Sequence, residues 1–262
     1  LTAPEMILSS VIFFNSEEDG LNFVEQARDE SYKSRKNKSD FGINALSLEY
    51  FDNNSLNFLS ADYPNIPVEA NSAVWFEQET DEHSQDKITE EWMSLIEKHS
   101  GNLENSWIAM NEKDKLHFVE FRHRISAKVN DFISSRNLQK LGTDFAVPDN
   151  ELKKFYYKLK SDVESAGFDY VIYGHFGNSH IHLNILPKNS DEFEKAKALY
   201  QKMCISVIKS GGTFSAEHGV GKNKKALLSE MYGTDVMNQM FRIKLNLDPN
   251  LILCRGNLFD NQ

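Results

Sequence analysis

The chain has 262 residues, a net charge of −10, 40% hydrophobic and 11% aromatic residues, an ordinary composition for a globular protein with a sizeable core. The acidic balance excludes the basic footprint that nucleic-acid binding requires, and it argues against electrostatic docking on anionic lipid. Two cysteines offer no disulfide framework, which fits a reducing compartment. No apolar run reaches the roughly 18 residues that suggest a membrane span. The chain starts with Leu1, so we expect its natural N-terminus to lie upstream.

The first hundred or so residues alternate apolar runs with amphipathic segments. Strands are expected at three apolar runs, residues 6–14, 44–50 and 73–78. Ser16, followed by Asp19 three residues later, predicts a helix start of the capping-box type, and a second helix is expected over residues 88–98. Two polar, charged stretches predict exposed loops, residues 31–40 and 80–86.

The longest predicted helix covers residues 111–135. Apolar side chains recur there at helical spacing, at Phe118, Phe121, Ile125, Val129 and Phe132. Further strands are expected at residues 142–147, 169–175 and 180–186. Further helices are expected from Pro148 to about residue 165, over 193–207 and over 226–245, before an irregular tail. This order predicts an α+β fold, a ferredoxin-like type of mainly antiparallel sheet covered by helices, plus a C-terminal helical segment. The dinucleotide-binding pattern GxGxxG is absent.

Histidines gather in residues 173–187, YGHFGNSHIHLNILP. Strand alternation places His180, His182 and Asn184 on one face and turns the intervening apolar side chains toward the core. His175 ends the preceding strand across a short turn. Two imidazoles on neighbouring strands, His175 and His182, are a plausible half of a metal site.

A second segment, residues 211–221, GGTFSAEHGVG, places Glu217 and His218 among glycines that let backbone approach a ligand closely. Two imidazoles with one carboxylate suit Zn, Mn, Fe or Co with open positions for substrate. The residues alone leave a plainer alternative open, in which the strand histidines are only hydrogen-bonded and the Glu-His pair is surface. The remaining histidines need no special role as ligands, namely His83, His99, His117, His123 and also His180.

These two segments resemble the paired signatures of the C-terminal domain of FAD-linked oxidases, the family that includes D-lactate dehydrogenase, the flavoprotein subunit of glycolate oxidase and D-2-hydroxyglutarate dehydrogenase. The first signature, GHxGDGNxHxN in the family, is kept at Gly174, His175, Gly177, His182 and Asn184. It departs from the family at Asn178, Ser179 and His180, where Asp, Gly and Asn are usual. The second signature, AEHGxG, is intact at residues 216–221.

Three further segments extend the resemblance over most of the chain, VEFRHRISAKVN at 119–130, TDFAVP at 143–148 and IKLNLDPNLILCRGNLF at 243–259. The first resembles a family helix whose arginine grips the substrate carboxylate. The last resembles the closing segment that lies beside the flavin, which implies flavin contacts by Cys254, Gly256 and Asn257. Cys254 and Arg255 replace the usual Asn and Pro, so those contacts depart from the family pattern.

The resemblance implies that residues 1–262 form a substrate-binding (cap) domain, and that the FAD-binding domain precedes it at the N-terminal side of the full polypeptide. The implied reaction is FAD-dependent oxidation of a D-2-hydroxy acid to the 2-oxo acid, with hydride transfer to the flavin and a divalent metal, zinc by preference. The implied roles are metal binding by His175, His182 and Glu217, general base catalysis by His218, and substrate contacts by Arg122, Ser126, Lys140 and Asn184. On residue type alone, Arg122 and Ser126 would be a solvated helix edge and Lys140 a surface lysine.

The implied partners are a small anionic 2-hydroxy acid, the FAD domain of the same polypeptide, and an electron acceptor such as a quinone, a cytochrome or another flavoprotein. No nucleic acid is expected, a homodimer is left open, and the expected location is cytoplasmic or peripheral at the inner membrane face. Two alternatives remain at this stage. One is a metal-free flavoenzyme acting on another alcohol, and the other is a non-catalytic subunit of an electron-transfer complex.

Overall fold

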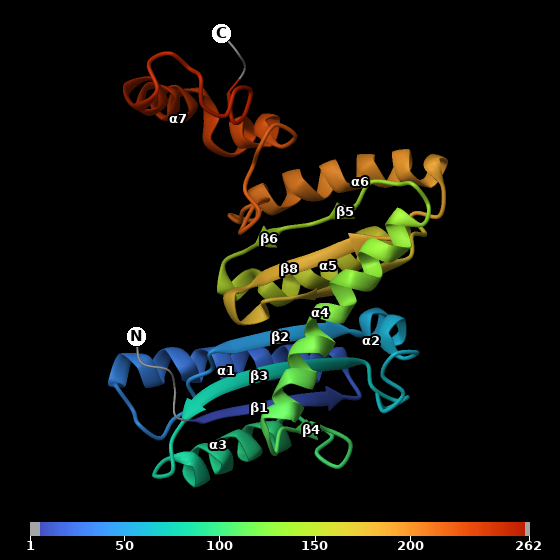
Figure 1. The fold of residues 1–262 in the computed structure, drawn as a ribbon, viewed down its shortest axis with the longest axis vertical. Coiled ribbons are helices and arrows are strands. Elements are labelled where there is room, and N and C mark those ends of the chain that lie inside the picture. Colours follow the sequence, from blue (N-terminus) through green and yellow to red (C-terminus); the bar gives the residue numbers. More distant parts are fainter. Residues whose placement is uncertain (1–5, 260–262) are drawn as a thin grey trace.

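One mainly antiparallel sheet runs through the protein, and helices cover both of its faces (Figure 1). The computed structural model describes residues 6–259. The strands are β1 (Met6–Phe14), β2 (Ser47–Asp52), β3 (Ser72–Thr80), β4 (Trp107–Ile108), β5 (Leu141–Gly142), β6 (Phe145–Ala146), β7 (Tyr170–Gly174) and β8 (His180–Ile185). The helices are α1 (Glu17–Asn37), α2 (Asn53–Leu59), α3 (Gln85–Lys98), α4 (Glu112–Ser134), α5 (Leu152–Ser165), α6 (Ser190–Lys209) and α7 (Lys225–Leu247). The predicted α+β class is confirmed.

The strand order is β4-β1-β3-β2-β7-β8-β5, with β6 beside β8, and each of these pairs is antiparallel. The first four strands, taken with α1 and α3, follow the βαββαβ order of a ferredoxin-like unit, with α2 inserted after β2. The predicted ferredoxin-like sheet therefore corresponds to the N-terminal half of this larger sheet.

The two halves of the sheet meet at a short ladder between β2 and β7. Backbone pairing there joins Tyr50 with Gly174 and Phe51 with Tyr173. Side chains extend the junction beyond the ladder. The buried Asp52 carboxylate accepts from the backbone N–H of Ile172 at 3.0 Å, and the Ser55 hydroxyl donates to the Ile172 carbonyl at 3.0 Å. The junction is therefore held by side-chain hydrogen bonds as well as by the ladder.

Two apolar clusters lie on opposite faces of the sheet. On one face, α1, α3, α5 and α6 cover the larger cluster, and on the other face α4 and α2 cover the smaller one. The predicted stripe of α4 is confirmed at Phe118, Phe121, Ile125 and Val129, which are buried. Phe132 is only partly buried, and Ile133 takes the fully buried position in the last turn. Because α4 packs over strands of both sheet halves, it also carries Arg122 and Ser126 to the junction.

The structure confirms the helix start at Ser16, whose hydroxyl accepts from the backbone N–H groups of Glu18 and Asp19. The predicted loop over residues 31–40 is wrong, because α1 continues to Asn37 and buries two of its serines. The Ser31 hydroxyl donates to the Ala27 carbonyl and accepts from the backbone N–H of Ala45. The polar face of α1 therefore packs against the residues that precede β2. The polar composition of residues 31–40 does not predict this contact.

Three further boundaries differ from prediction. The strand expected over 44–50 begins later, at Ser47. The strand expected over 142–147 is divided into β5 and β6, which both pair with β8. The C-terminal helix α7 is broken at Gly233, whose φ of 73° is not helical. Within residues 6–259, no helix combines the length and hydrophobicity needed to cross a membrane.

Candidate metal centre and substrate cleft

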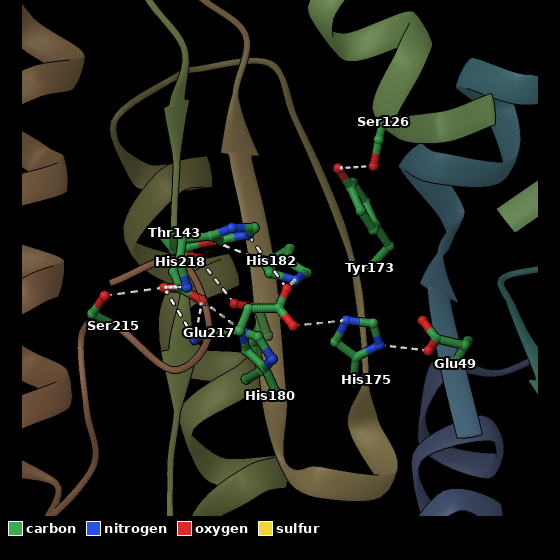
Figure 2. Close-up of polar contacts among 12 residues, drawn as sticks. Glu49, Ser126, Thr143, Tyr173, His175, His180, His182, Ser215, Glu217 and His218 are labelled. Atoms are coloured by element: carbon green, nitrogen blue, oxygen red, sulfur yellow. Dashed lines mark hydrogen bonds and ion pairs between the residues drawn. The ribbon is translucent and has the colours of Figure 1, made fainter. Parts of the chain in front are cut away.

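Three histidines and one glutamate converge where the two halves of the sheet meet (Figure 2). His175, His180, His182 and Glu217 each offer a ligand atom, and these atoms lie within 4.8 Å of one another. A second, overlapping group contains Asp144, His182, Glu217 and His218. The structure thus brings together the predicted set His175, His182 and Glu217, and it adds His180, which was not predicted as a ligand.

The β7–β8 turn sets the positions of the histidines. Gly174, the last residue of β7, has a φ of +148°, and a Cβ there would lie 2.7 Å from the His180 carbonyl oxygen. Only glycine therefore lets the two strands approach at this point. The His175 and His182 ring centroids are 5.6 Å apart, and those of His180 and His182 are 4.3 Å apart. As predicted, the apolar residues between the β8 histidines lie in the core.

Each imidazole has one nitrogen held by a fixed hydrogen-bond acceptor. His175 Nδ1 lies 2.5 Å from Glu49 Oε1, and this hydrogen bond raises the pKa of His175. His180 Nε2 lies 2.9 Å from Asp144 Oδ1, although burial lowers the pKa of His180. His182 Nδ1 donates to the Thr143 carbonyl at 3.0 Å, and burial lowers the pKa of His182 to about 4. Partners of this kind fix the ring orientation of metal-binding histidines.

The donor set fits a divalent cation, as His182 shows most clearly. A carbonyl oxygen can only accept, so His182 Nδ1 must carry its proton and Nε2 must present a lone pair. That lone pair faces Glu217 Oε1 at 3.2 Å. Burial acts to raise the pKa of Glu217, but the surrounding histidines outweigh it and lower the pKa, so the carboxylate is ionised near pH 7. Two acceptors in contact repel each other, and a cation between them removes that repulsion.

Glu217 and His218 come from a loop rather than from a strand. The loop curls so that both side chains face the cleft, with His218 Nε2 3.3 Å from Glu217 Oε1. Adjacent side chains of an extended segment point to opposite faces, but residues 216–218 form a bend, so Glu217 and His218 both face the cleft. Gly219 follows this bend with a φ of +73°, which extended backbone does not adopt.

The cluster lies in the wall of a cleft of about 500 Å³, a size typical of small-molecule sites. The predicted substrate residues Arg122, Ser126, Lys140 and Asn184 all line it, together with His175, His182, Glu217 and His218. Arg122 Nη2 lies 3.3 Å from His175 Nε2, and Arg122 Nε lies 3.5 Å from Glu49 Oε2. Desolvation lowers the pKa of Lys140.

Two other polar groups of the cleft are available to a ligand. The buried Asn184 Oδ1 has no hydrogen-bond partner among the described residues, and a Cβ at Gly142 would lie 2.5 Å from it. The glycine therefore leaves room beside an unsatisfied acceptor. Ser126 on α4 and Tyr173 on β7 share a hydrogen bond of 3.0 Å between their hydroxyl oxygens (Figure 2).

The predicted flavin-contact residues do not join this cleft. Cys254, Gly256 and Asn257 line a separate hollow formed by the tail and the end of α7. Several residues of the cleft were not predicted from the sequence, namely Glu49, Asp144, Tyr173 and Lys224. Asp144 lies inside the segment TDFAVP, so that motif was a usable signal. For Glu49, no spacing in the sequence tied it to a histidine 126 positions away.

The protein thus combines an antiparallel sheet covered by helices with a histidine–carboxylate cluster in a cleft that also contains Arg122. Residues 4–258 match the family described as "FAD linked oxidases, C-terminal domain". The chain belongs to this family, which confirms the resemblance.

Several relatives are similar over most of the chain. A probable mitochondrial D-lactate dehydrogenase of Danio rerio is 24% identical over 262 residues, 98% of this chain and 49% of that protein. The glycolate oxidase subunit GlcD of Bacillus subtilis is 23% identical over 217 residues, 81% of this chain and 45% of that protein. The chain therefore spans about half the length of these relatives.

The fold is shared with p-cresol methylhydroxylase, solved with substrate bound. That structure aligns with a TM-score of 0.69 and 14% identity, over 100% of this chain and 55% of its own. At this identity, the likeness speaks for the fold alone.

Proposed function

We propose that this chain is the substrate-binding domain of an FAD-dependent dehydrogenase that oxidises a D-2-hydroxy acid of the lactate, glycolate or 2-hydroxyglutarate type. The observation that carries the proposal is the convergence of His175, His182 and Glu217 on one cleft with Arg122. A cation site beside a guanidinium matches the hydroxyl and carboxylate of a 2-hydroxy acid. The names of the relatives, D-lactate dehydrogenase and glycolate oxidase, support the same substrate class.

The metal-binding residues of the proposal are His175, His182 and Glu217, with His180 close enough to join them. Zinc is the preferred ion, because it takes imidazole and carboxylate ligands while leaving a position open. A metal held by these residues would supply polarisation of the substrate hydroxyl, and a flavin held mainly by another domain of the polypeptide would supply the acceptor for the C2 hydride.

The protein residues have three tasks in this proposal. Arg122 binds the substrate carboxylate, because a guanidinium fork matches a carboxylate bidentately. Asn184, Ser126 and Lys140 fix the substrate in the cleft by further polar contacts. His218 accepts the hydroxyl proton, so that loss of this proton and of the C2 hydride together give the 2-oxo acid. Its exposed imidazole lies beside Glu217 and can pass the proton to solvent.

The remaining assignments follow from this proposal. Residues 1–262 act as one substrate-binding (cap) domain, and a quinone, a cytochrome or another flavoprotein takes the electrons from the flavin. Tail residues Cys254, Gly256 and Asn257 approach the flavin from their separate hollow. Residues 1–262 expressed alone are expected to fold and to bind no flavin tightly, because in this proposal another domain of the polypeptide makes most of the flavin contacts.

Two measurements test the proposal. The purified chain, stripped with a chelator and titrated with Zn²⁺, should bind one equivalent. In the full polypeptide with its flavin, His218→Ala should lower kcat for the D-2-hydroxy acid by roughly 10²–10⁴-fold while the zinc content stays unchanged. Absence of stoichiometric metal binding would favour a metal-free flavoenzyme instead. An unchanged kcat in His218→Ala would show that His218 is not the base. If kcat were also unchanged in Arg122→Ala, the chain would more readily be explained as a non-catalytic subunit.

A further inference from the structure

The loop that carries Glu217 and His218 contains no helix or strand, yet it holds both side chains in the cleft. Glu217 keeps 42% of its side chain exposed and His218 keeps 65%. Side-chain packing therefore cannot account for their positions. Another contact must hold the loop against the sheet.

One buried carboxylate supplies that contact. Asp144, only 2% exposed, follows β5 and accepts hydrogen bonds from the loop with both side-chain oxygens. Asp144 Oδ1 accepts from the backbone N–H of Glu217 at 3.2 Å, and Oδ2 accepts from that of His218 at 3.0 Å and from the Ser215 hydroxyl at 3.2 Å. The Asp144 carbonyl also accepts from the backbone N–H of Ala216 at 3.0 Å. A single residue thus binds the loop at four consecutive positions.

The same carboxylate also contacts the strand-borne part of the cluster. Its Oδ1 accepts from His180 Nε2 at 2.9 Å, and Lys224 Nζ lies 3.9 Å from its Oδ2. Among the described residues, the groups that form hydrogen bonds or ion pairs with this carboxylate are therefore donors or cations, while an oxygen of the Glu217 carboxylate lies within 4.8 Å of it. An amide at this position would turn an NH₂ group toward backbone N–H donors, and two donors cannot share a hydrogen bond.

We propose that Asp144 is a positioning residue that clamps the Glu217–His218 loop onto β8 and so places the loop-borne metal ligand opposite His175 and His182. This inference rests on the proposed function for the identity of the ligand. The clamp itself rests only on the hydrogen bonds above. Asp144 touches neither substrate nor metal in this scheme and acts through the backbone of Glu217 and His218.

The experiment compares Zn²⁺ affinity in wild type, Asp144→Asn, Glu217→Gln and the double variant, by chelator competition on the purified chain. Partners that orient metal ligands typically change affinity by about 10–100-fold, and Asp144→Asn should weaken Zn²⁺ binding within that range. If Asp144 acts through Glu217, adding Asp144→Asn to Glu217→Gln should cause little further loss. Losses that simply multiply in the double variant would overturn the clamp, because they would indicate a general structural role.

A metal-free readout separates this inference from the proposed function. Amide hydrogen exchange in the stripped chain should show protected N–H groups at Glu217 and His218, and Asp144→Asn should speed their exchange. Asp52→Asn is the matched control, because Asp52 is also a buried carboxylate that accepts hydrogen bonds from backbone N–H groups. This variant should leave the exchange rates of the Glu217 and His218 amides and the Zn²⁺ affinity unchanged. Wild type that binds no zinc would defeat the proposed function alone. Unprotected loop amides in wild type would defeat the clamp.

If Asp144→Asn does not fold, Ser215→Ala provides a milder test. It removes the Ser215 hydrogen bonds to Asp144 and to the Gly219 carbonyl while leaving the carboxylate in place. It should speed exchange at Glu217 and His218 and weaken Zn²⁺ binding by a few-fold. Exchange rates equal to those of wild type would count against the clamp.

Discussion

The strand-borne and loop-borne parts of the candidate site reach the same cleft by different means. His180 and His182 lie on β8, largely buried, and each has one ring nitrogen held by a neighbouring acceptor. Glu217 and His218 lie on an exposed loop whose backbone is held mainly by Asp144. The strand part is positioned by the core and the loop part by hydrogen bonds to Asp144. We therefore expect substitutions in the strand part to lower both stability and affinity, and substitutions in the loop part to lower affinity without unfolding.

The largest expected effect concerns the junction that supports the strand part. Burial raises the pKa of Asp52 from its ordinary 3.8 to about 7. Below pH 4 the carboxyl is protonated in both states, but between pH 4 and 7 only the unfolded chain releases the proton. The free energy of unfolding should therefore fall as pH rises through this window, by up to about 4 kcal/mol.

Asp52→Asn keeps the acceptor for the Ser55 and Ile172 N–H groups and removes the ionisation. Urea unfolding of metal-free wild type and variant at pH 5 and pH 8 checks the prediction. The stability of the variant relative to wild type should increase at the higher pH. If the difference in unfolding free energy between variant and wild type were the same at pH 5 and pH 8, Asp52 would not titrate in this range.

The next effect compares a ligand from each part. His182→Ala removes a buried ligand with a fixed ring, and it should weaken Zn²⁺ binding by more than the roughly 100-fold that marks the upper end for supporting partners. Glu217→Gln should cost less, because the amide keeps an acceptor oxygen in the same position. Calorimetric titration of both variants measures the difference. Equal losses of Zn²⁺ affinity in the two variants would indicate that the strand part and the loop part are equally preorganised, which would contradict the difference proposed between them.

A smaller effect is expected for the partner of His175. Glu49→Gln weakens the acceptor that orients the His175 ring and should lower Zn²⁺ affinity by about 10-fold. Glu77→Gln is the matched control, since Glu77 is a half-buried carboxylate on the adjacent strand β3 without a histidine contact among the described residues. The control should bind Zn²⁺ as wild type does. A similar loss in both variants would mean that sheet charge, rather than ring orientation, sets the affinity.

The smallest effect tests the loop backbone alone. Gly219 has a φ of +73°, and a Cβ there would have open space around it, so Gly219→Ala introduces backbone strain without a clash. The cost of the left-handed region for alanine, about 1 kcal/mol, should appear as a few-fold loss of Zn²⁺ affinity at unchanged thermal stability. A fall in melting temperature with unchanged affinity would place the strain outside the site.

Most helices and strands could be predicted from the sequence because their signals are local. The stripe of α4 and the Ser16 cap need only nearby residues, and the alternation in β8 placed its histidines opposite the core. The loop predicted over residues 31–40 was wrong because Ser31 is satisfied by a contact with Ala45 that local polarity does not reveal.

The candidate site divides in the same way. His175, His182, Glu217 and His218 stand in short motifs, whereas Glu49 reaches His175 only through the pairing of β2 with β7. The direction of His218 follows from the bend at residues 216–218, which strand alternation does not describe. Tertiary pairing and positive φ values are the information that the motifs do not contain.

The short ladder between β2 and β7 has a consequence for folding. Glu49 belongs to the ferredoxin-like half of the sheet and His175 to the other half, so their hydrogen bond exists only after the two halves have met. Helix α4 packs over strands of both halves (Figure 1). Each half can gather its own helices through contacts that are closer in sequence, which form at lower entropic cost. We therefore expect the cleft to be completed late in folding, after the two halves dock and Glu49 can orient His175.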